Sequence, residues 1–203
     1  MSQKTNKLYS LFSNTFFYSL SQKIMSGTSF RASIVRKYID RNNVNVLDIG
    51  CGPAEILNSL PRVNYFGYDI SPIYINFAKK KYETNGNFYC KRFTNKELKK
   101  LPKFDHVLLL GVLHHLEDKE IEKLNSQIKK VLKKGGNIIS VDPILEIKQN
   151  PIAKFIIKKD RGNNVRNKKG YLKNMKKSFK NIKSKIYHQS FIPYTWFVMI
   201  SKN

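Results

Sequence analysis

With 203 residues, the chain is long enough for one domain with a sizeable core, and two full domains would be cramped. Its hydrophobic content of 41% and aromatic content of 12% exclude a disordered chain, and no apolar run reaches the about 18 residues of a membrane span. The formal net charge of +24 fits an anionic partner, but 31 of the 38 basic residues are lysine, whereas nucleic-acid readers rely on the forked guanidinium of arginine. A solvated lysine coat explains the charge equally well.

Two helices are expected at the N-terminal end, over residues 8–25 and 28–40. Residues 8–20 are amphipathic and aromatic, and polar residues interrupt them too often for the core of a signal peptide. We therefore expect residues 1–40 to form a helical cap that packs on the domain.

From residue 44 onward, apolar runs alternate with amphipathic segments, which is the pattern of strands and helices in turn. The expected strands are 44–49, 63–69, 87–91, 104–110 and 137–142, and the expected helices are 54–60, 72–83, 95–100 and 118–133. Strands that alternate with helices predict a parallel sheet, and the nearly unbroken apolar run of residues 104–110 predicts a strand buried on both faces.

The alternation ends at Pro143. Residues 143–170 have the pattern of an insertion, with a short helix over 151–158 and then a polar loop, and a helix over 171–178 follows. Two final strands, 181–190 and 194–201, are joined by a link too short for a parallel crossover, so we expect a hairpin whose last strand runs antiparallel to the sheet.

The first strand ends in a glycine-rich turn that indicates a nucleotide-like ligand. Asp48 lies near the carboxyl end of the strand, where open α/β sheets bind ligands, and Gly50 and Gly52 let the backbone approach a ligand closely. The dinucleotide fingerprint needs a third glycine where this chain has Glu55, and the Gly-Lys-Ser/Thr of a phosphate loop is absent. Because the carboxylate of Glu55 would also repel a pyrophosphate, the sequence argues against both phosphate-binding interpretations.

Four segments in this order resemble the class I S-adenosylmethionine-dependent methyltransferases, in particular small-molecule enzymes of the type 11/12 group. They are Val46–Ala54 at the glycine turn, Gly67–Ser71 after the second strand, Phe104–Leu116 around the fourth strand, and Leu132–Pro143 leading into the fifth. The resemblance implies one methyltransferase domain over residues 1–203, with S-adenosyl-L-methionine as its cofactor. It also implies an α/β, Rossmann-like, doubly wound sheet of seven strands, mostly parallel with an antiparallel last strand, in the order 3-2-1-4-5-7-6. The insertion of residues 143–170 would shape the acceptor site.

The resemblance further implies the residues that contact the cofactor: Asp48, Gly50, Cys51, Gly52, Asp69, Ile70, Arg92, Phe93, Leu110 and Gly111. The turn would meet the methionine part, Asp69 at the next strand end would accept both ribose hydroxyls, and Ile70 would cover the adenine. A helix cap is the alternative role of Asp69. Many family members have an acid for the adenine amino group where this chain has Arg92, so adenine recognition would pass to backbone groups and Phe93.

Candidate catalytic residues lie at the ends of the fourth and fifth strands. His114 and His115 would position the acceptor or take a proton from it, and Asp142 would face the same pocket. The alternatives are that His115 packs or caps a helix, and that Asp142 is a turn residue before Pro143.

Arg161, Arg166 and Tyr171 are candidate substrate-binding residues in the polar loop and just after it. Because arginine forks a carboxylate or phosphate, they predict an anionic group on the acceptor, and the alternative is an internal ion pair with Asp160. The same segment resembles a stretch in a subgroup of bacterial small-molecule methyltransferases of unassigned substrate.

These residues together predict an enzyme that moves a methyl group from S-adenosylmethionine to an O or N atom of a small molecule. The charge suggests a nucleic-acid methyltransferase as the alternative, but the Asp/Asn-Pro-Pro-Tyr-like loop and a Pro-Cys nucleophile are both missing from the sequence. A non-catalytic protein that binds S-adenosylmethionine is a third interpretation. Cys51 and Cys90 have neither metal-ligand spacing nor a disulfide framework, so we expect no metal site and a cytoplasmic location. The sequence leaves the methylated atom and the oligomeric state open.

Overall fold

The computed structural model describes residues 27–160, 162–190 and 193–203. The helix expected over residues 8–25 and the substrate candidate Arg161 lie outside these described residues.

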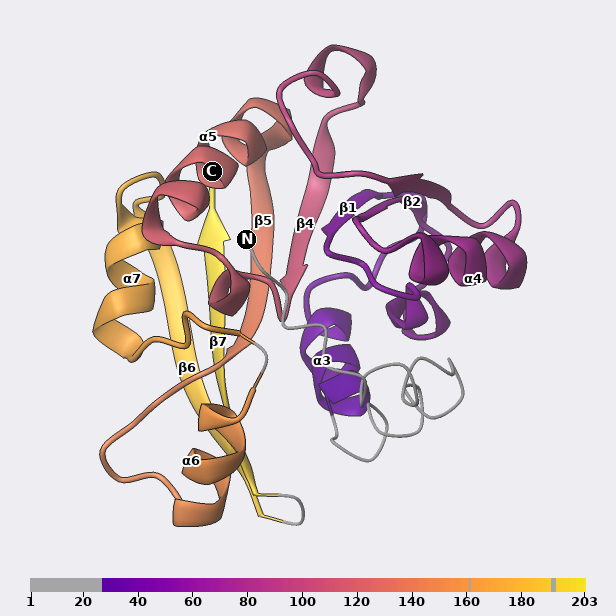
Figure 1. Ribbon diagram of the computed structural model, residues 1–203. Helices are drawn as coiled ribbons and strands as arrows, with labels where there is room; N and C mark the ends of the chain where they lie inside the picture. Colours follow the sequence, from indigo (N-terminus) through magenta and orange to yellow (C-terminus); the bar gives the residue numbers. More distant parts are fainter. Residues whose placement is uncertain (1–26, 161, 191–192) are drawn as a thin grey trace.

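The protein is built around one seven-stranded sheet, in the order β3-β2-β1-β4-β5-β7-β6 (Figure 1). The strands are β1 (Asn45–Ile49), β2 (Asn64–Asp69), β3 (Asn87–Cys90), β4 (Phe104–Leu110), β5 (Leu132–Pro143), β6 (Asn181–Gln189) and β7 (Tyr194–Lys202). Strands β1 to β5 pair in parallel, whereas β7 pairs antiparallel with both β5 and β6. The predicted fold class, strand order and antiparallel last strand are therefore confirmed.

Most of the helices begin at side chains that cap them. The described α-helices are α3 (Gly27–Arg36), α4 (Pro72–Tyr82), α5 (Asp118–Val131), α6 (Pro151–Lys158) and α7 (Lys168–Lys176). Ser71, Asn150 and Asn167 accept backbone N–H bonds at the starts of α4, α6 and α7, and Glu117 and Glu120 form a capping box at α5. Each cap satisfies N–H groups that the first helical turn leaves without a partner.

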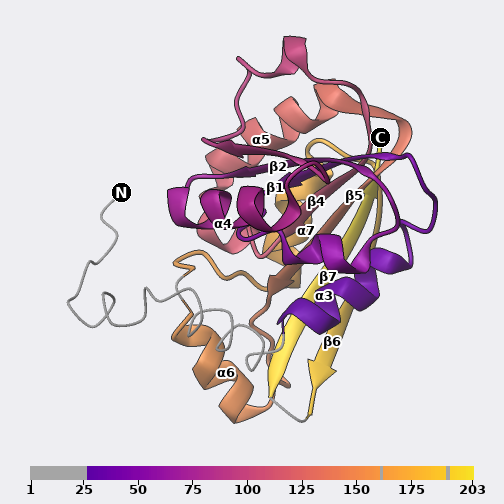
Figure 2. The same ribbon diagram turned by 90° about the vertical axis from the view of Figure 1, so that its right-hand side faces the viewer.

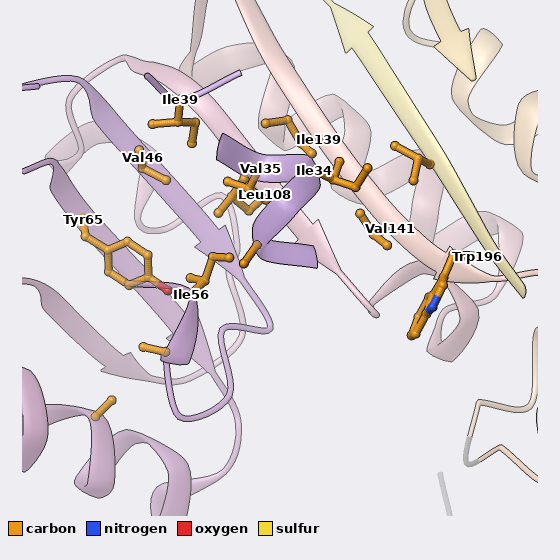
Figure 3. Close-up of a cluster of buried hydrophobic side chains, with 14 of the residues drawn as sticks. Ile34, Val35, Ile39, Val46, Ile56, Tyr65, Leu108, Ile139, Val141 and Trp196 are labelled. Atoms are coloured by element: carbon orange, nitrogen blue, oxygen red, sulfur yellow. The ribbon is translucent and has the colours of Figure 1, made fainter. Parts of the chain in front are cut away.

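The sheet is covered on both faces, because neighbouring residues of its central strands point into different cores. Val46 and Leu108 belong to a core with side chains of α3, α4 and α6, whereas Leu47 and Leu109 belong to one with α5 and α7. Figure 2 shows α5 on the opposite side of β1 and β2 from α3. Figure 3 shows Ile34 and Val35 of α3 lying over the first of these cores. Burial of both faces explains the unbroken apolar run of β4.

The local structure differs from the sequence prediction at three places. Residues 54–60 form a 3₁₀ turn, η1 (Glu55–Ser59), and residues 95–100 contain only η2 (Leu98–Lys100), where α-helices were expected. Strand β5 begins at Leu132, because the Gly135–Gly136 pair forms an irregularity inside the strand rather than a stop for α5. Gly135 has a φ of +78°, which favours glycine at that irregularity.

None of the described helices is long and apolar enough to cross a bilayer. Within the described ranges, no three His, Cys, Asp or Glu side chains gather in a way that could hold a metal ion. Cys51 and Cys90 are free thiols.

Candidate active site

The glycine turn after β1 leaves open space beside its backbone. Gly50 and Gly52 have φ angles of +74° and +54°, in the region that glycine favours. A Cβ added to Gly50 would lie 2.7 Å from Cγ2 of Val112, whereas one added to Gly52 would meet no atom within 4 Å. The Gly50 and Cys51 N–H groups both donate to the carbonyl oxygen of Tyr68, which holds the turn against the end of β2. A ligand can therefore approach the backbone at Gly52.

Asp69 ties this turn to the start of α4. Its Oδ2 accepts the Gly52 N–H at 2.9 Å and its Oδ1 accepts the Ser71 N–H at 2.8 Å. The N-cap of α4 is Ser71, and Asp69 accepts the backbone N–H of that capping residue. An ionised carboxylate can accept about four hydrogen bonds, which leaves capacity for hydroxyl groups of a ligand. The neighbouring Ile70 is 58% exposed and offers an apolar surface at the same strand end.

Asp48 is buried beneath the turn with one unsatisfied oxygen. Its Oδ2 accepts the Tyr65 hydroxyl at 2.6 Å, whereas its Oδ1 has no hydrogen-bond partner among the described residues. Burial raises the pKa of Asp48 to about 7, although the Tyr65 hydrogen bond opposes this shift. A buried carboxylate oxygen of this kind suits a ligand that carries an N–H group or a positive charge.

Arg31 of α3 is the residue at this site that the sequence analysis missed. A Cβ on Gly111 would lie 2.6 Å from Nη2 of Arg31, so the guanidinium lies directly over the glycine that ends β4. The guanidinium carbon is 5.1 Å from the centre of the Trp196 ring, and its charge lowers the pKa of Asp48 against the effect of burial. An arginine between the helix residues Phe30 and Ala32 was the available signal, but helical periodicity does not reveal that it reaches a strand end.

Arg92 and Phe93, the two residues after β3 that were expected to contact the cofactor, make internal contacts. Nη1 of Arg92 is 3.4 Å from Oε1 of Glu120 on α5. Phe93 is buried in the core beside α5, with its ring edge toward Tyr68 at 5.4 Å between centroids. Leu110 is half-buried at the end of β4.

His114 lies between two carboxylates. It belongs to η3 (Leu113–His115), directly after β4, and is 4% exposed. Nδ1 is 2.8 Å from Oδ1 of Asp142 at the end of β5, and Nε2 is 3.3 Å from Oδ1 of Asp160 in the loop after α6. Burial opposes a charge on the ring, but the bonds to Asp142 and Asp160 outweigh it and raise the pKa of His114 to about 9. With both nitrogens bonded and the ring protonated near neutral pH, His114 is poorly suited to take a proton from an acceptor.

His115 is the exposed member of the histidine pair. Its ring lies 4.0 Å from the His114 ring between centroids, at an interplanar angle of 39°. The structure therefore brings His114, Asp142 and Asp160 together in the interior and leaves His115 exposed at the end of η3.

Arg166 uses its guanidinium inside the protein. Its five N–H groups match five close acceptor contacts: the carbonyl oxygens of Leu113, Asn164 and Leu116, and Oδ1 of Asp118 from both Nε and Nη2. An anion would have to displace these bonds, so the geometry agrees with the internal ion pair, with Asp118 in place of Asp160. Tyr171 is 1% exposed and donates its hydroxyl to the carbonyl oxygen of Pro143, so it too has a structural role here.

Residues 47–138 match the family model described as "Methyltransferase domain". They span the glycine turn, the end of β2 and the histidine pair, within a sheet of the order already described. This part of the chain, a little under half of its length, is similar to a methyltransferase domain.

Solved structures share this methyltransferase fold at low sequence identity. Human N-acetylserotonin methyltransferase in complex with SAM matches with a TM-score of 0.71 and 16% identity, over 100% of this chain and 60% of the human chain. A SAM-dependent methyltransferase from Archaeoglobus fulgidus matches with a TM-score of 0.68 and 16% identity, over 92% of this chain and 100% of that one. The 1,6-didemethyltoxoflavin-N1-methyltransferase of Burkholderia thailandensis, with bound 1,6-didemethyltoxoflavin and S-adenosylhomocysteine, matches with a TM-score of 0.65 and 14% identity, over 100% and 92%. A search of curated protein sequences found no match.

Proposed function

We propose that the protein binds S-adenosylmethionine and transfers its methyl group to an O or N atom of a small molecule. The observation that carries the proposal is the open glycine turn tied to Asp69, because it joins close backbone access with a carboxylate at the adjacent strand end. The family match and the fold support the same reaction class.

The residues present fit this cofactor. Asp69 would accept the ribose hydroxyls with its remaining lone pairs, and the exposed side chain of Ile70 would lie against the adenine. The methionine part carries an ammonium and a carboxylate, and the site offers the opposite charges on Asp48 and Arg31. The cofactor itself supplies the methyl group on a sulfonium, so the protein needs mainly to bind and align the acceptor.

His115 is our candidate for the residue that contacts the acceptor, because it is exposed in η3, the short turn that follows β4. His114 is assigned no proton-transfer role, since both of its nitrogens face carboxylates. A small-molecule acceptor is supported by the solved structures whose names specify their substrates, N-acetylserotonin and 1,6-didemethyltoxoflavin. Because the guanidinium of Arg166 is bonded inside the protein, this residue does not support an anionic group on the acceptor.

A nucleic-acid acceptor is the second candidate, favoured by one surface. Four lysines and Leu172 line a shallow hollow of about 510 Å³ along α7, namely Lys168, Lys169, Lys173 and Lys176. The hollow follows α7, which lies on the face of the sheet opposite α3, so its lysines would serve to bind phosphates rather than to align an acceptor atom.

Methyl transfer from labelled S-adenosylmethionine tests both candidates. The protein is incubated with pooled phenols, amines and heterocycles in one arm and with total RNA or duplex DNA in the other. We expect label and S-adenosylhomocysteine only in the small-molecule arm, and loss of both in Asp69→Ala. Label in the RNA or DNA arm with a steep salt dependence would favour the second candidate.

A further inference from the structure

Asp160 and residues 162–166, which we call the clamp loop, fold directly onto the turn that follows β4. A Cβ added to Gly162 would lie 2.0 Å from Cδ2 of His114 and 2.8 Å from its carbonyl oxygen, so the loop backbone touches the imidazole without a side chain between them. The N–H of Asn164 donates to the same carbonyl oxygen at 2.9 Å. The contact therefore requires glycine on the loop and fixes both the ring and the backbone of residue 114.

The same contact is ionic. Asp142 and Asp160 approach opposite nitrogens of the His114 ring at 2.8 and 3.3 Å. A protonated imidazole donates from both nitrogens, whereas a neutral one donates from only one, so the bridge is complete only when the ring is charged. Asp160 is itself held in place, because its Oδ1 accepts the Gly162 N–H and its Oδ2 accepts the Tyr194 hydroxyl at 3.0 Å.

Arg166 fastens the other end of the clamp loop. Its guanidinium binds the carbonyl oxygens of Leu113 and Leu116, which flank the histidine pair, and the Asp118 carboxylate at the start of α5. The turn that carries His115 is thus held in two ways. Arg166 binds its backbone carbonyl oxygens, and the neighbouring His114 ring is bound by Asp142 and Asp160.

We propose that His114, Asp142 and Asp160 are positioning residues: the cationic ring bridges the two carboxylates, holds the clamp loop on the turn after β4, and so fixes His115 at the acceptor side of the site. The placement of His115 at the acceptor side rests on the proposed function, whereas the bridge rests on the distances between His114 and the two carboxylates. From sequence alone, a histidine pair at a strand end suggests two catalytic bases. In this arrangement the two rings have different roles: His114 is a positioning residue, and His115 is the candidate for contact with the acceptor.

Other charged or titratable groups near the bridge are Arg31 of α3, His115 of η3, Tyr171 of α7, Tyr194 of β7 and, in the clamp loop itself, Arg166. None of them is a carboxylate, so Asp142 and Asp160 are the groups whose removal should change the charge state of His114.

The test is NMR of the histidine ring signals in the full chain, with His114 assigned by its loss in His114→Gln. We expect His114 to titrate near pH 9 in the wild type, and Asp160→Asn to lower its midpoint by more than one pH unit and to speed amide exchange at Gly162 and Asn164 at least tenfold. Asp160→Glu should restore part of both effects. Glu146→Gln, a half-buried acid before α6, is the matched control and should change neither.

Two results would overturn the proposal: a wild-type His114 that titrates near its ordinary value of 6.5, or titration and exchange that Asp160→Asn leaves unchanged. If Asp160→Asn does not fold, Tyr194→Phe takes its place. This variant removes the hydroxyl that holds Asp160 beside the ring and should lower the midpoint of His114. The wild-type titration then decides the question by itself. Binding of S-adenosylhomocysteine is measured on the same samples. Its absence in the wild type would contradict the proposed function and leave the bridge standing.

Discussion

Raising the pH from 7 to 9.5 should destabilise the folded protein, chiefly through His114. Its pKa in the folded protein is about 9 against an ordinary value of 6.5, so the folded state holds the proton more tightly than the unfolded chain. The stabilisation is fully present below pH 6.5 and is lost as the pH rises through 9. The difference corresponds to about 3 kcal/mol, of which about 2 kcal/mol is lost between pH 7 and pH 9.5.

Asp48 acts in a lower pH range and can be separated from His114. Its pKa is raised from 3.8 to about 7, so its contribution to stability falls as the pH rises from 4 to 7 and changes little above that. The buried tyrosines Tyr65, Tyr171 and Tyr194 have pKa values raised above 10, which places their effects beyond the upper end of the range. Burial also raises the pKa of the Cys51 thiol above its ordinary value of 9.0, so stability falls for this second reason near the upper end of the range. The comparison of the wild type with His114→Gln therefore isolates the histidine.

Urea unfolding, followed by the fluorescence of the single tryptophan, Trp196, measures this effect at several pH values. His114→Gln should be less stable than the wild type at pH 7 and should lack most of the decrease between pH 7 and 9.5. The reasoning is refuted if both proteins lose the same free energy of unfolding over that range.

Three further predictions concern the clamp loop and the buried acid. Gly162→Ala should lower the free energy of unfolding by about 1–3 kcal/mol in urea titrations, because its Cβ would overlap the ring and carbonyl of His114. Arg166→Lys should lower the free energy of unfolding by about 2 kcal/mol, since lysine cannot replace five N–H contacts. The control is Arg36→Lys, which gives up two exposed bonds to Ser59 and should change the free energy of unfolding by less than about 0.5 kcal/mol. Affinity for S-adenosylhomocysteine should rise between pH 6 and 8 as Asp48 ionises, and calorimetry of Asp48→Asn should show a flat profile; an equal rise in both proteins would remove Asp48 from the site.

The strands could be predicted because their signals are local. The apolar run Phe104–Leu110 matches β4 residue for residue, and the short link before β7 allowed only an antiparallel partner. The glycine turn could also be predicted from the sequence, because the positive φ angles at Gly50 and Gly52 favour glycine over other residue types.

The roles of the polar residues could not be read in this way, because their partners are distant in the chain. Arg166 meets Asp118 and Asp160 meets His114, each pair more than forty residues apart, and no spacing rule connects them. The sequence predicted that Arg166 binds an anion, and in the fold that anion is the Asp118 carboxylate at the start of α5. Tyr171 was expected near a substrate, but the start of α7 at Lys168 turns its side chain into the core.

The most direct test of the central claim is calorimetric titration of the wild type and of Asp69→Asn with S-adenosylhomocysteine, with Glu122→Gln on the outer face of α5 as the matched control. The account predicts one site per chain in the wild type and in the control, and affinity at least tenfold weaker in Asp69→Asn, because a lost charge-assisted bond to a hydroxyl is worth about 1.5 kcal/mol or more. No binding by a folded wild-type protein, or equal affinity in all three proteins, would contradict it.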